Sequence, residues 1–154
     1  MLDIGQILQK ADEQKTFEVH IVEDNPEDNW TLNIKKPPPR KSQRWINFMM
    51  SNFMAIMDRQ KAENALAEEV QTEQAGKRFL MDNLDTLLDF AGEILDLTES
   101  WEGIQAENKK QIKDFMLLTP IQAASFAVQF ISDLQNWQTS LKKNYLPELN
   151  GNSI

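Results

Sequence analysis

Acidic side chains at helical spacing are the residues of this chain that come closest to doing chemistry. Five of them recur every three or four residues along one segment: Asp82, Asp85, Asp89, Glu93 and Asp96. Carboxylates placed in this way could share a proton, or could hold metal ions inside a helical bundle. A di-metal bundle site also needs several histidine ligands, and the sequence has only His20. Because the acids alternate with apolar residues, we interpret them as the solvated face of an amphipathic helix.

The remaining residue types offer little to a catalyst. The chain of 154 residues contains no cysteine, which excludes disulfides, thiolate metal sites and cysteine nucleophiles. His20 alternates with apolar residues beside Glu18, as an outward-facing strand residue does, and it has no second histidine for a metal site. The acidic turn at 24–28 lacks the ligand spacing of a calcium-binding loop. We therefore predict a protein that is not an enzyme and has no catalytic, metal or cofactor site.

Two short segments near the N-terminus alternate apolar and polar residues, which is the period of a half-buried strand. They cover residues 17–21 and 30–34, and turn-forming residues at 23–29 separate them. This arrangement predicts an antiparallel hairpin, preceded by a short helix over 3–13 with Asp3 as its N-cap. Because an isolated hairpin is only marginally stable in water, its apolar face must pack on helices or on another subunit.

Three consecutive prolines at 37–39 are expected to end the second strand, because proline cannot donate to a strand ladder. Ser42 then has the residue type of a helix N-cap. Residues 43–75 contain neither glycine nor proline, and they predict one long helix or two helices that meet at a bend near 58–61. Gly76, which follows, is either a break or a glycine tolerated inside a helix.

The second half of the chain is helical in pattern as well. Apolar residues at spacings of three and four predict a strongly amphipathic helix over 77–97. A loop is expected at 98–103, followed by a moderate helix over 106–118. Thr119 and Pro120 are residue types typical of a helix start, so a final helix should begin there and end at 145–147.

These elements predict a mostly α fold, a helical domain with a small N-terminal antiparallel β-hairpin. We expect a helix and hairpin element with a Pro-rich basic linker over 1–41, a helical domain over 42–146 and a flexible tail over 147–154. The first residues do not resemble a signal peptide, and no stretch approaches about 18 uninterrupted apolar residues. The expected location is therefore the cytoplasm, with no membrane contact.

The start of the long helix is apolar around most of its girth. Phe48, Met50 and Met54 do not fit the stripe of apolar residues that begins at Trp45. A helix of this kind is buried on more than one side, so these residues belong either to the core or to a groove for a partner. The partner-binding hypothesis includes the leucine-rich helix and the final helix, with these residues: Trp45, Phe48, Met49, Met50, Phe53, Met54, Met57, Leu84, Leu88, Phe130 and Trp137.

A basic segment without acids surrounds the three prolines. Its five basic residues are Lys35, Lys36, Arg40, Lys41 and Arg44. With tryptophans nearby, the segment has the composition of a small nucleic-acid interface. It is also compatible with a solvated linker, or with a contact to an acidic region in a neighbouring copy of the chain. We predict no nucleic-acid binding and assign the five residues to a contact within a homo-oligomer.

The net charge supports that choice. Acidic residues number 24 against 16 lysines and arginines, which gives a net charge of −8. Twelve acids and four bases lie at positions 58–102, so this span accounts for the whole net charge. Such a balance disfavours non-specific binding to nucleic acid or to an anionic membrane.

The second half of the chain resembles a known family. Trp101-Glu-Gly103-Ile104 forms a Trp-x-Gly-Ile corner after a leucine-rich helix, and an apolar turn with Thr119-Pro120 and a long final helix follow. This layout resembles the tail assembly chaperones of long-tailed bacteriophages. Many members of that family also carry a small N-terminal β-element with proline-marked strands, as the segment 17–37 would be.

The resemblance implies a function without catalysis. Such chaperones coat the long, aggregation-prone tape measure protein until the tail tube polymerises around it, and many are made in two lengths by a ribosomal frameshift. The resemblance therefore implies the tape measure protein or other tail proteins as partners, in the host cytoplasm. The acidic composition would keep a complex of chaperone and client soluble, and a broad apolar helical surface would bind amphipathic client helices.

Two alternatives from other classes stay open. The chain could be an acidic inhibitor that occupies a nucleic-acid groove of a host or defence factor, with the carboxylates at 58–102 imitating phosphates. It could also be a structural component of the virion. Salt dependence of partner binding distinguishes the inhibitor, and presence in purified particles distinguishes the structural component.

Overall fold

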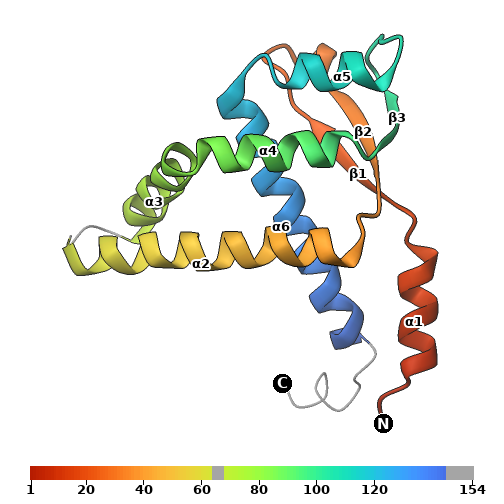
Figure 1. Ribbon diagram of the computed structural model, residues 1–154, viewed down its shortest axis with the longest axis horizontal. Helices are drawn as coiled ribbons and strands as arrows, with labels where there is room; N and C mark the ends of the chain where they lie inside the picture. Colours follow the sequence, from red (N-terminus) through yellow and green to blue (C-terminus); the bar gives the residue numbers. More distant parts are fainter. Residues whose placement is uncertain (64–67, 145–154) are drawn as a thin grey trace.

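The computed structural model describes the backbone of residues 1–63 and 68–144, and the side chains of this part except those of 53–63, 68–73, 142 and 144. This part is mostly α-helical with a small antiparallel sheet (Figure 1), which confirms the predicted fold class. In chain order the elements are α1 (Ile4–Glu13), β1 (Thr16–Ile21), the 3-10 turn η1 (Pro26–Asp28), β2 (Trp30–Lys35), α2 (Pro39–Glu63), α3 (Glu68–Asp82), α4 (Leu84–Leu95), β3 (Thr98–Glu102), α5 (Lys109–Met116) and α6 (Pro120–Asn144).

The sheet has the strand order β1-β2-β3, and both neighbouring pairs are antiparallel. β1 and β2 form the predicted hairpin, in which Val19 lies opposite Leu32. The third strand, β3, occupies the position where the sequence predicted a loop at 98–103, so that prediction was wrong. Only Thr98 is buried and Trp101 half-buried in this strand, which leaves no apolar alternation to detect.

The helix α1 begins where the sequence predicts it. The Asp3 side chain caps the helix by accepting a 3.0 Å hydrogen bond from the backbone N–H of Gln6. The Nζ of Lys36, just after β2, donates a 2.8 Å hydrogen bond to the carbonyl of Ala11. This bond holds α1 beside the end of the hairpin, although none of the ten residues of α1 is buried.

The helix α2 begins at Pro39, earlier than the sequence predicts. Ser42 is therefore not its N-cap: it is buried inside the first turns, and its Oγ donates a 3.2 Å hydrogen bond to the carbonyl of Pro38. Proline fits the first turn of a helix because the N–H that it lacks would have no partner there. Pro37 and Pro38 thus lie between β2 and α2, and Pro39 is the first residue of α2.

The long helical region is divided in two. α2 continues through 58–61, where a bend was one of the two alternatives, and α3 begins at Glu68; the residues between the two helices lie outside the described part. α3 packs back against α2. Gly76 lies inside α3, so it is a glycine tolerated within a helix.

A break at Asn83 separates α3 from α4, so the single helix predicted over 77–97 is wrong. The backbone N–H and the side-chain amide of Asn83 both donate to the carbonyl of Phe79, at 3.1 and 3.0 Å. An asparagine side chain that bonds to a nearby carbonyl competes with regular helical hydrogen bonds. The apolar spacing continues across Asn83, which is why periodicity alone did not reveal the break.

The helix α5 is shorter than the predicted 106–118 and starts after its N-cap Asn108, whose side chain accepts a 2.9 Å hydrogen bond from the N–H of Gln111. α6 begins at Pro120, as predicted. Within the described residues no single helix has both the length and the apolar character needed to cross a membrane. Only α5 and α6 together meet that requirement, and they are bent by 111°.

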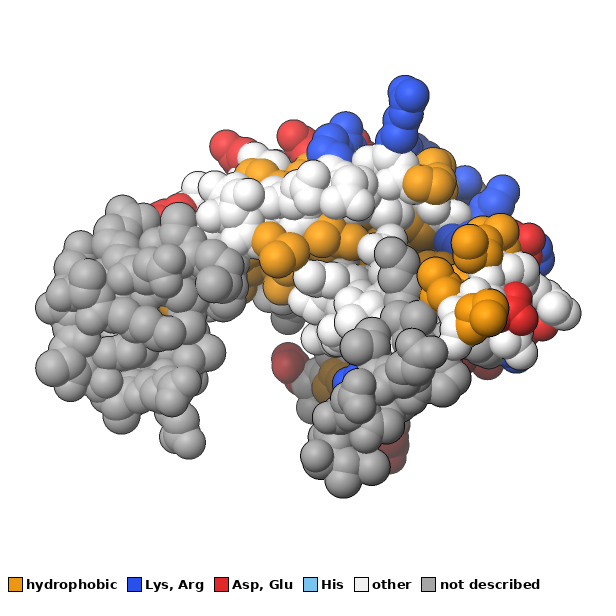
Figure 2. All heavy atoms as spheres, turned by 90° about the horizontal axis from the view of Figure 1, so that it is seen from below, with side chains coloured by type: hydrophobic (Ala, Val, Ile, Leu, Met, Phe, Trp, Pro, Cys, Tyr) orange, Lys and Arg blue, Asp and Glu red, His pale blue; other side chains and the backbone are white. Residues whose placement is uncertain are grey.

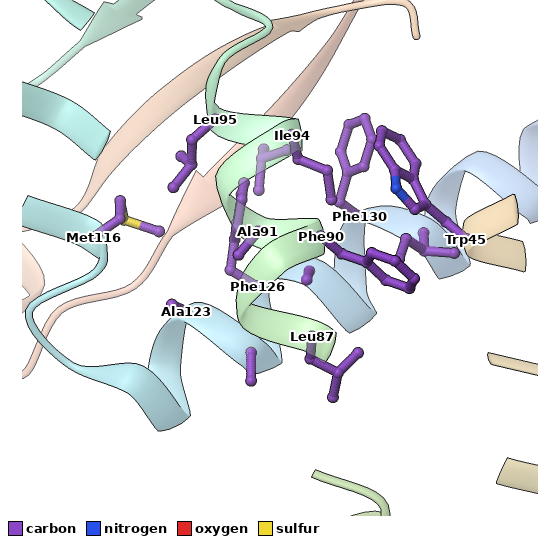
Figure 3. Packing of buried hydrophobic residues seen from close by; sticks show 14 of the residues in the cluster. Trp45, Leu87, Phe90, Ala91, Ile94, Leu95, Met116, Ala123, Phe126 and Phe130 are labelled. Atoms are coloured by element: carbon purple, nitrogen blue, oxygen red, sulfur yellow. The ribbon is translucent and has the colours of Figure 1, made fainter. Parts of the chain in front are cut away.

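One hydrophobic cluster joins the sheet to the helices. In Figure 3, the side chains of α4 point toward those of α6, and Trp45 of α2 closes one end of the cluster. Residues 1–41 contribute Val19, Trp30, Leu32 and Ile34 to the same cluster. The predicted boundary at 41–42 therefore does not separate two cores, and the predicted tail at 147–154 lies outside the described residues.

Candidate partner-binding surfaces

Two of the residues predicted to bind a partner are core residues instead. Trp45 is 0 % exposed and Phe130 is 1 % exposed, and their ring centroids lie 6.4 Å apart. A partner cannot reach either side chain without opening the core. Helical spacing identified both as apolar-face residues, but spacing does not say whether that face meets a partner or another helix of the same chain.

The neighbouring residues of α2 lie at the edge of the core. The ring of Phe48 is half-buried and lies 5.2 Å from that of Phe90 in an edge-to-face arrangement. Met50 is 51 % exposed, and its Sδ accepts a 3.3 Å hydrogen bond from Nε2 of Gln135 on α6. α2 therefore has an apolar side chain at the surface directly beside residues that stabilise the core.

Most of the other predicted partner residues stand at the margin of the core. Four are half-buried and pack against it: Met49, Leu84, Leu88 and Trp137. The side chains of three others lie outside the described residues: Phe53, Met54 and Met57. On the face seen in Figure 2, the apolar side chains of the described residues form patches between polar atoms. Among the predicted partner residues whose side chains are described, only Met50 is exposed, and the others are half-buried or buried.

The basic segment is partly used within the chain. Arg44 forms an ion pair with Glu93 of α4, and Lys36 bonds to α1 and lies 6.0 Å from the centre of the Trp137 ring. The side chains of Lys35 and Arg40 are exposed and form no ion pair or hydrogen bond within the described residues, although the backbone N–H of Lys35 donates to the carbonyl of Leu97 at 2.8 Å. The positive charge of Lys41 acts on Glu93 of α4. Because α2 starts at Pro39, the segment is largely a helix start and not the linker that was one alternative.

The Glu93 carboxylate has two donors. Its Oε2 accepts hydrogen bonds from the guanidinium of Arg44 and, at 2.8 Å, from Nε1 of Trp45. Burial of Glu93 by itself raises the pKa of this carboxyl group, but the two hydrogen bonds and the positive charges of Arg44 and Lys41 outweigh it. The pKa therefore lies below its ordinary value, and the group links α2 to α4 as a carboxylate.

The other acids of the predicted solvated face are exposed, as expected: Asp82, Asp85, Asp89 and Asp96. Asp96 pairs with Lys113 of α5 at 2.8 Å. Within the described residues, no group of three or more His, Asp or Glu side chains is placed to hold a metal ion. Asp96 thus links the end of α4 to α5, and Asp82, Asp85 and Asp89 are exposed to solvent.

His20 is exposed on β1, as predicted. Its Nδ1 lies 3.2 Å from the Oγ1 of Thr31 on the neighbouring strand, and its Nε2 lies 3.5 Å from Oε1 of Glu18. Both contacts are on the solvent side of the sheet, because the residues that alternate with them, such as Val19, face the core. The imidazole thus contacts a side chain on each strand of the hairpin at the surface.

The Trp-x-Gly-Ile corner has a structural role. Trp101 lies opposite Leu32 in the sheet, and the turn that follows has Gly103 at φ +87°, a conformation that favours glycine. A Cβ at this glycine would lie 3.2 Å from the carbonyl of Asn29 and 3.3 Å from Trp30. The corner therefore brings the end of β3 close against the start of β2.

Sequence reasoning missed a groove between β1 and the α5–α6 junction. It has a volume of about 580 Å³ and is lined by the end of β1, by Phe115 and Leu118, and by the first turns of α6. Val22 and Leu118 are 79 and 75 % exposed beside it. The available signal was the pair of adjacent leucines before Thr119, since only one of them can share the buried face of the helix.

Comparison with protein-family models, with curated proteins and with solved structures finds no match to this chain.

Proposed function

We propose that this chain is a non-enzymatic tail assembly chaperone of a long-tailed bacteriophage. In this proposal it binds the tape measure protein in the host cytoplasm and keeps it soluble until the tail tube forms. The choice of family rests on the resemblance carried by Trp101-Glu-Gly103-Ile104 and by Thr119-Pro120 before the long α6. The observation that supports a client surface is the position of Met50, a half-exposed apolar side chain beside half-buried Phe48 and Met49. Methionine adapts its shape to different partners, which suits a long client whose sequence changes along its length.

The client surface follows from what the core leaves accessible. Trp45 and Phe130 do not belong to the client surface because they are buried. The described residues that remain are Phe48, Met49, Met50, Leu84, Leu88 and Trp137. An amphipathic client helix would cover these margins with its apolar face.

A solubility experiment tests the proposal. A fragment of the tape measure protein from the same genome is co-expressed with the chain, and the soluble fraction of the fragment is measured. We expect the fragment to stay soluble with the chain and to aggregate without it. Equal aggregation in both cases would overturn the proposal.

A pair of substitutions locates the surface. Met50→Ser should lower the soluble fraction of the client, because it removes an exposed apolar contact without touching the core. Ile4→Ser is the matched control, since Ile4 is 63 % exposed on α1, which contributes no residue to the proposed surface. If both variants behave alike, the client does not bind at Met50.

The proposal includes self-association. Lys35, Arg40 and Lys41 would contact the acidic residues at 58–102 of a neighbouring copy, and such a contact weakens as salt increases. Sedimentation of the chain at low and high salt measures it. An oligomer that is indifferent to salt would leave these three residues without the proposed role.

A second candidate is the acidic inhibitor, favoured by the exposure of Asp82, Asp85 and Asp89 around the α3–α4 break. It predicts partner binding that weakens steeply with salt, whereas binding through apolar surface depends on salt only weakly. The third candidate, a structural virion component, predicts that the chain is present in purified particles.

A further inference from the structure

β1 is an edge strand, and the hydrogen-bond pattern shows which of its backbone groups face outward. The N–H of Lys36 donates to the carbonyl of Lys15 at 2.9 Å, so these residues form a hydrogen-bonded pair. In an antiparallel ladder, hydrogen-bonded pairs alternate with pairs that are not hydrogen-bonded. The register therefore directs the backbone N–H and C=O groups of Phe17, Val19 and Ile21 toward β2. The backbone groups of the residues between them point to the free edge.

Part of this edge is covered within the chain. The outward carbonyl of Thr16 accepts a hydrogen bond from Nε2 of Gln14. Glu18, His20 and Val22 follow at alternate positions, and among the described residues no hydrogen bond to their outward backbone groups is recorded. An edge of this kind is a template for pairing with another extended segment.

An apolar groove runs beside the same edge. The buried residues Met116 and Phe126 form part of its lining, here called the floor, and the exposed Leu118 and Val22 also line it. A strand added to β1 would place every second side chain over this floor, since successive side chains of a strand point to opposite faces. The edge and the groove therefore require the same occupant, an extended segment with apolar residues at alternate positions.

The acidic residues at the groove favour a positively charged occupant. Glu23 and Asp24 line its end, and among the residues that line it there is neither lysine nor arginine. Asp28 stands beyond them in the acidic turn. A segment with lysine or arginine at one end would complement these carboxylates.

A second copy of β1 does not meet these requirements. Its inner face is already covered by its own α6, because the ring of Phe17 lies 6.0 Å from that of Phe130 and 5.2 Å from that of Trp137. That face cannot also be laid over the groove of a neighbour. A separate extended peptide has both faces free.

We propose that the edge of β1 at 18–22 and the adjoining groove bind an extended, cationic peptide segment as a fourth strand of the sheet. Alternate apolar side chains of the segment lie over Met116 and Phe126, and its basic end faces Glu23 and Asp24. This site does not depend on the proposed function, since it uses neither the α2 surface nor a tape measure client.

A designed peptide tests the site on the full chain. The probe is an acetylated and amidated peptide of two lysines followed by alternating valine and threonine. We expect saturable binding by titration calorimetry, with amide resonances of Glu18, His20 and Val22 shifted in NMR spectra. A peptide with glutamates in place of the lysines should bind at least about tenfold more weakly, which corresponds to about 1.4 kcal/mol.

Two matched changes isolate the backbone pairing. His20→Pro removes one outward N–H and leaves the hydrogen bonds of Val19 and Ile21 to β2, because proline is tolerated on the free side of an edge strand. It should weaken binding about tenfold, whereas His20→Ala should retain it. If His20→Pro lowers the melting temperature strongly, the probe methylated at alternate backbone nitrogens is tested on the unchanged chain and should not bind.

The groove has its own variant. Leu118→Ser removes an apolar side chain from the groove without adding a charge and should weaken binding about tenfold. Leu2→Ser, at an exposed leucine near the N-terminus, should not change it. The proposal is overturned if the probe does not bind, if the methylated probe binds equally, or if the shifted amides lie elsewhere. It is also overturned in favour of a second copy if the chain alone dimerises and His20→Pro makes it monomeric.

Discussion

The indole Nε1 of Trp45 donates a 2.8 Å hydrogen bond to the Glu93 carboxylate, which joins α2 to α4 at the boundary of the core. The tryptophan side chain is fully buried, while Glu93 is half-buried and also pairs with Arg44. A large apolar ring with one polar atom can enter a core only if that atom finds a partner. Glu93 provides this partner, and the basic residue beside it keeps the carboxyl group ionised.

Glu93→Ala should therefore destabilise the fold. It leaves the buried Nε1 of Trp45 without an acceptor, which costs about 1–3 kcal/mol. Chemical denaturation measures the change in the free energy of unfolding. Glu93→Gln is the control, because its carbonyl oxygen can still accept from the indole, and it should lose less stability than Glu93→Ala. Equal losses in the two variants would show that the hydrogen bond to Trp45 is not what stabilises this contact.

The stability should also depend on pH through Glu93. Its folded pKa is below the ordinary value of 4.5, so the unfolded chain binds the proton more readily. The stabilisation is fully present above pH 4.5 and is lost as the pH falls through the lowered pKa. The difference in unfolding free energy between the original chain and Glu93→Gln should be constant near neutral pH and shrink below about pH 4.5. A difference that grows on acidification would contradict the assignment.

Thr98→Val should stabilise the protein. The Oγ1 of Thr98 is buried at the start of β3 and has no hydrogen-bond partner among the described residues. A methyl group in its place removes the desolvation cost of an unpaired hydroxyl, for a gain of about 1 kcal/mol, or roughly 2–4 °C in melting temperature. Differential scanning calorimetry measures this shift. Thr98→Ser keeps the hydroxyl and loses the methyl group, so it should melt below the original chain.

Gly103→Ala should destabilise the corner after β3. The substitution places a Cβ against the backbone of Asn29 and Trp30 and also forces alanine into a positive φ. The expected cost is about 1–3 kcal/mol. Gly76→Ala is the matched control, because Gly76 lies within α3 and a Cβ there meets nothing within 4 Å. That variant should be neutral or slightly stabilising; a Gly103 variant as stable as the control would exclude strain at the corner.

The elements with strong periodicity could be predicted from the sequence. The alternation around Val19 and Leu32 predicted the hairpin, and Thr119-Pro120 predicted the start of α6. β3 could not be predicted, since its pairing with β2 depends on a partner more than sixty residues away and not on its own pattern. At the break, the Asn83 side chain forms a hydrogen bond to the carbonyl of Phe79, a contact that apolar spacing cannot predict.

The candidate site was predicted less well than the fold. The sequence set Met50 apart from the apolar stripe that begins at Trp45. It could not show that Trp45 lies in the core and Met50 at the surface, because a helix that is apolar on several sides can bury any of them. The groove beside β1 was missed for a related reason. It is made by residues from β1, α5 and α6 that only the folded chain brings together.

The position of β3 also has a consequence for synthesis on the ribosome. The hairpin is translated long before residues 98–102. One edge of β2 therefore lacks its neighbouring strand β3 while α2, α3 and α4 are synthesised. During that interval Trp30, Leu32 and Ile34 have no finished core to cover them. The nascent chain is therefore vulnerable to misassociation until α6, in its last third, has been made and can complete the core.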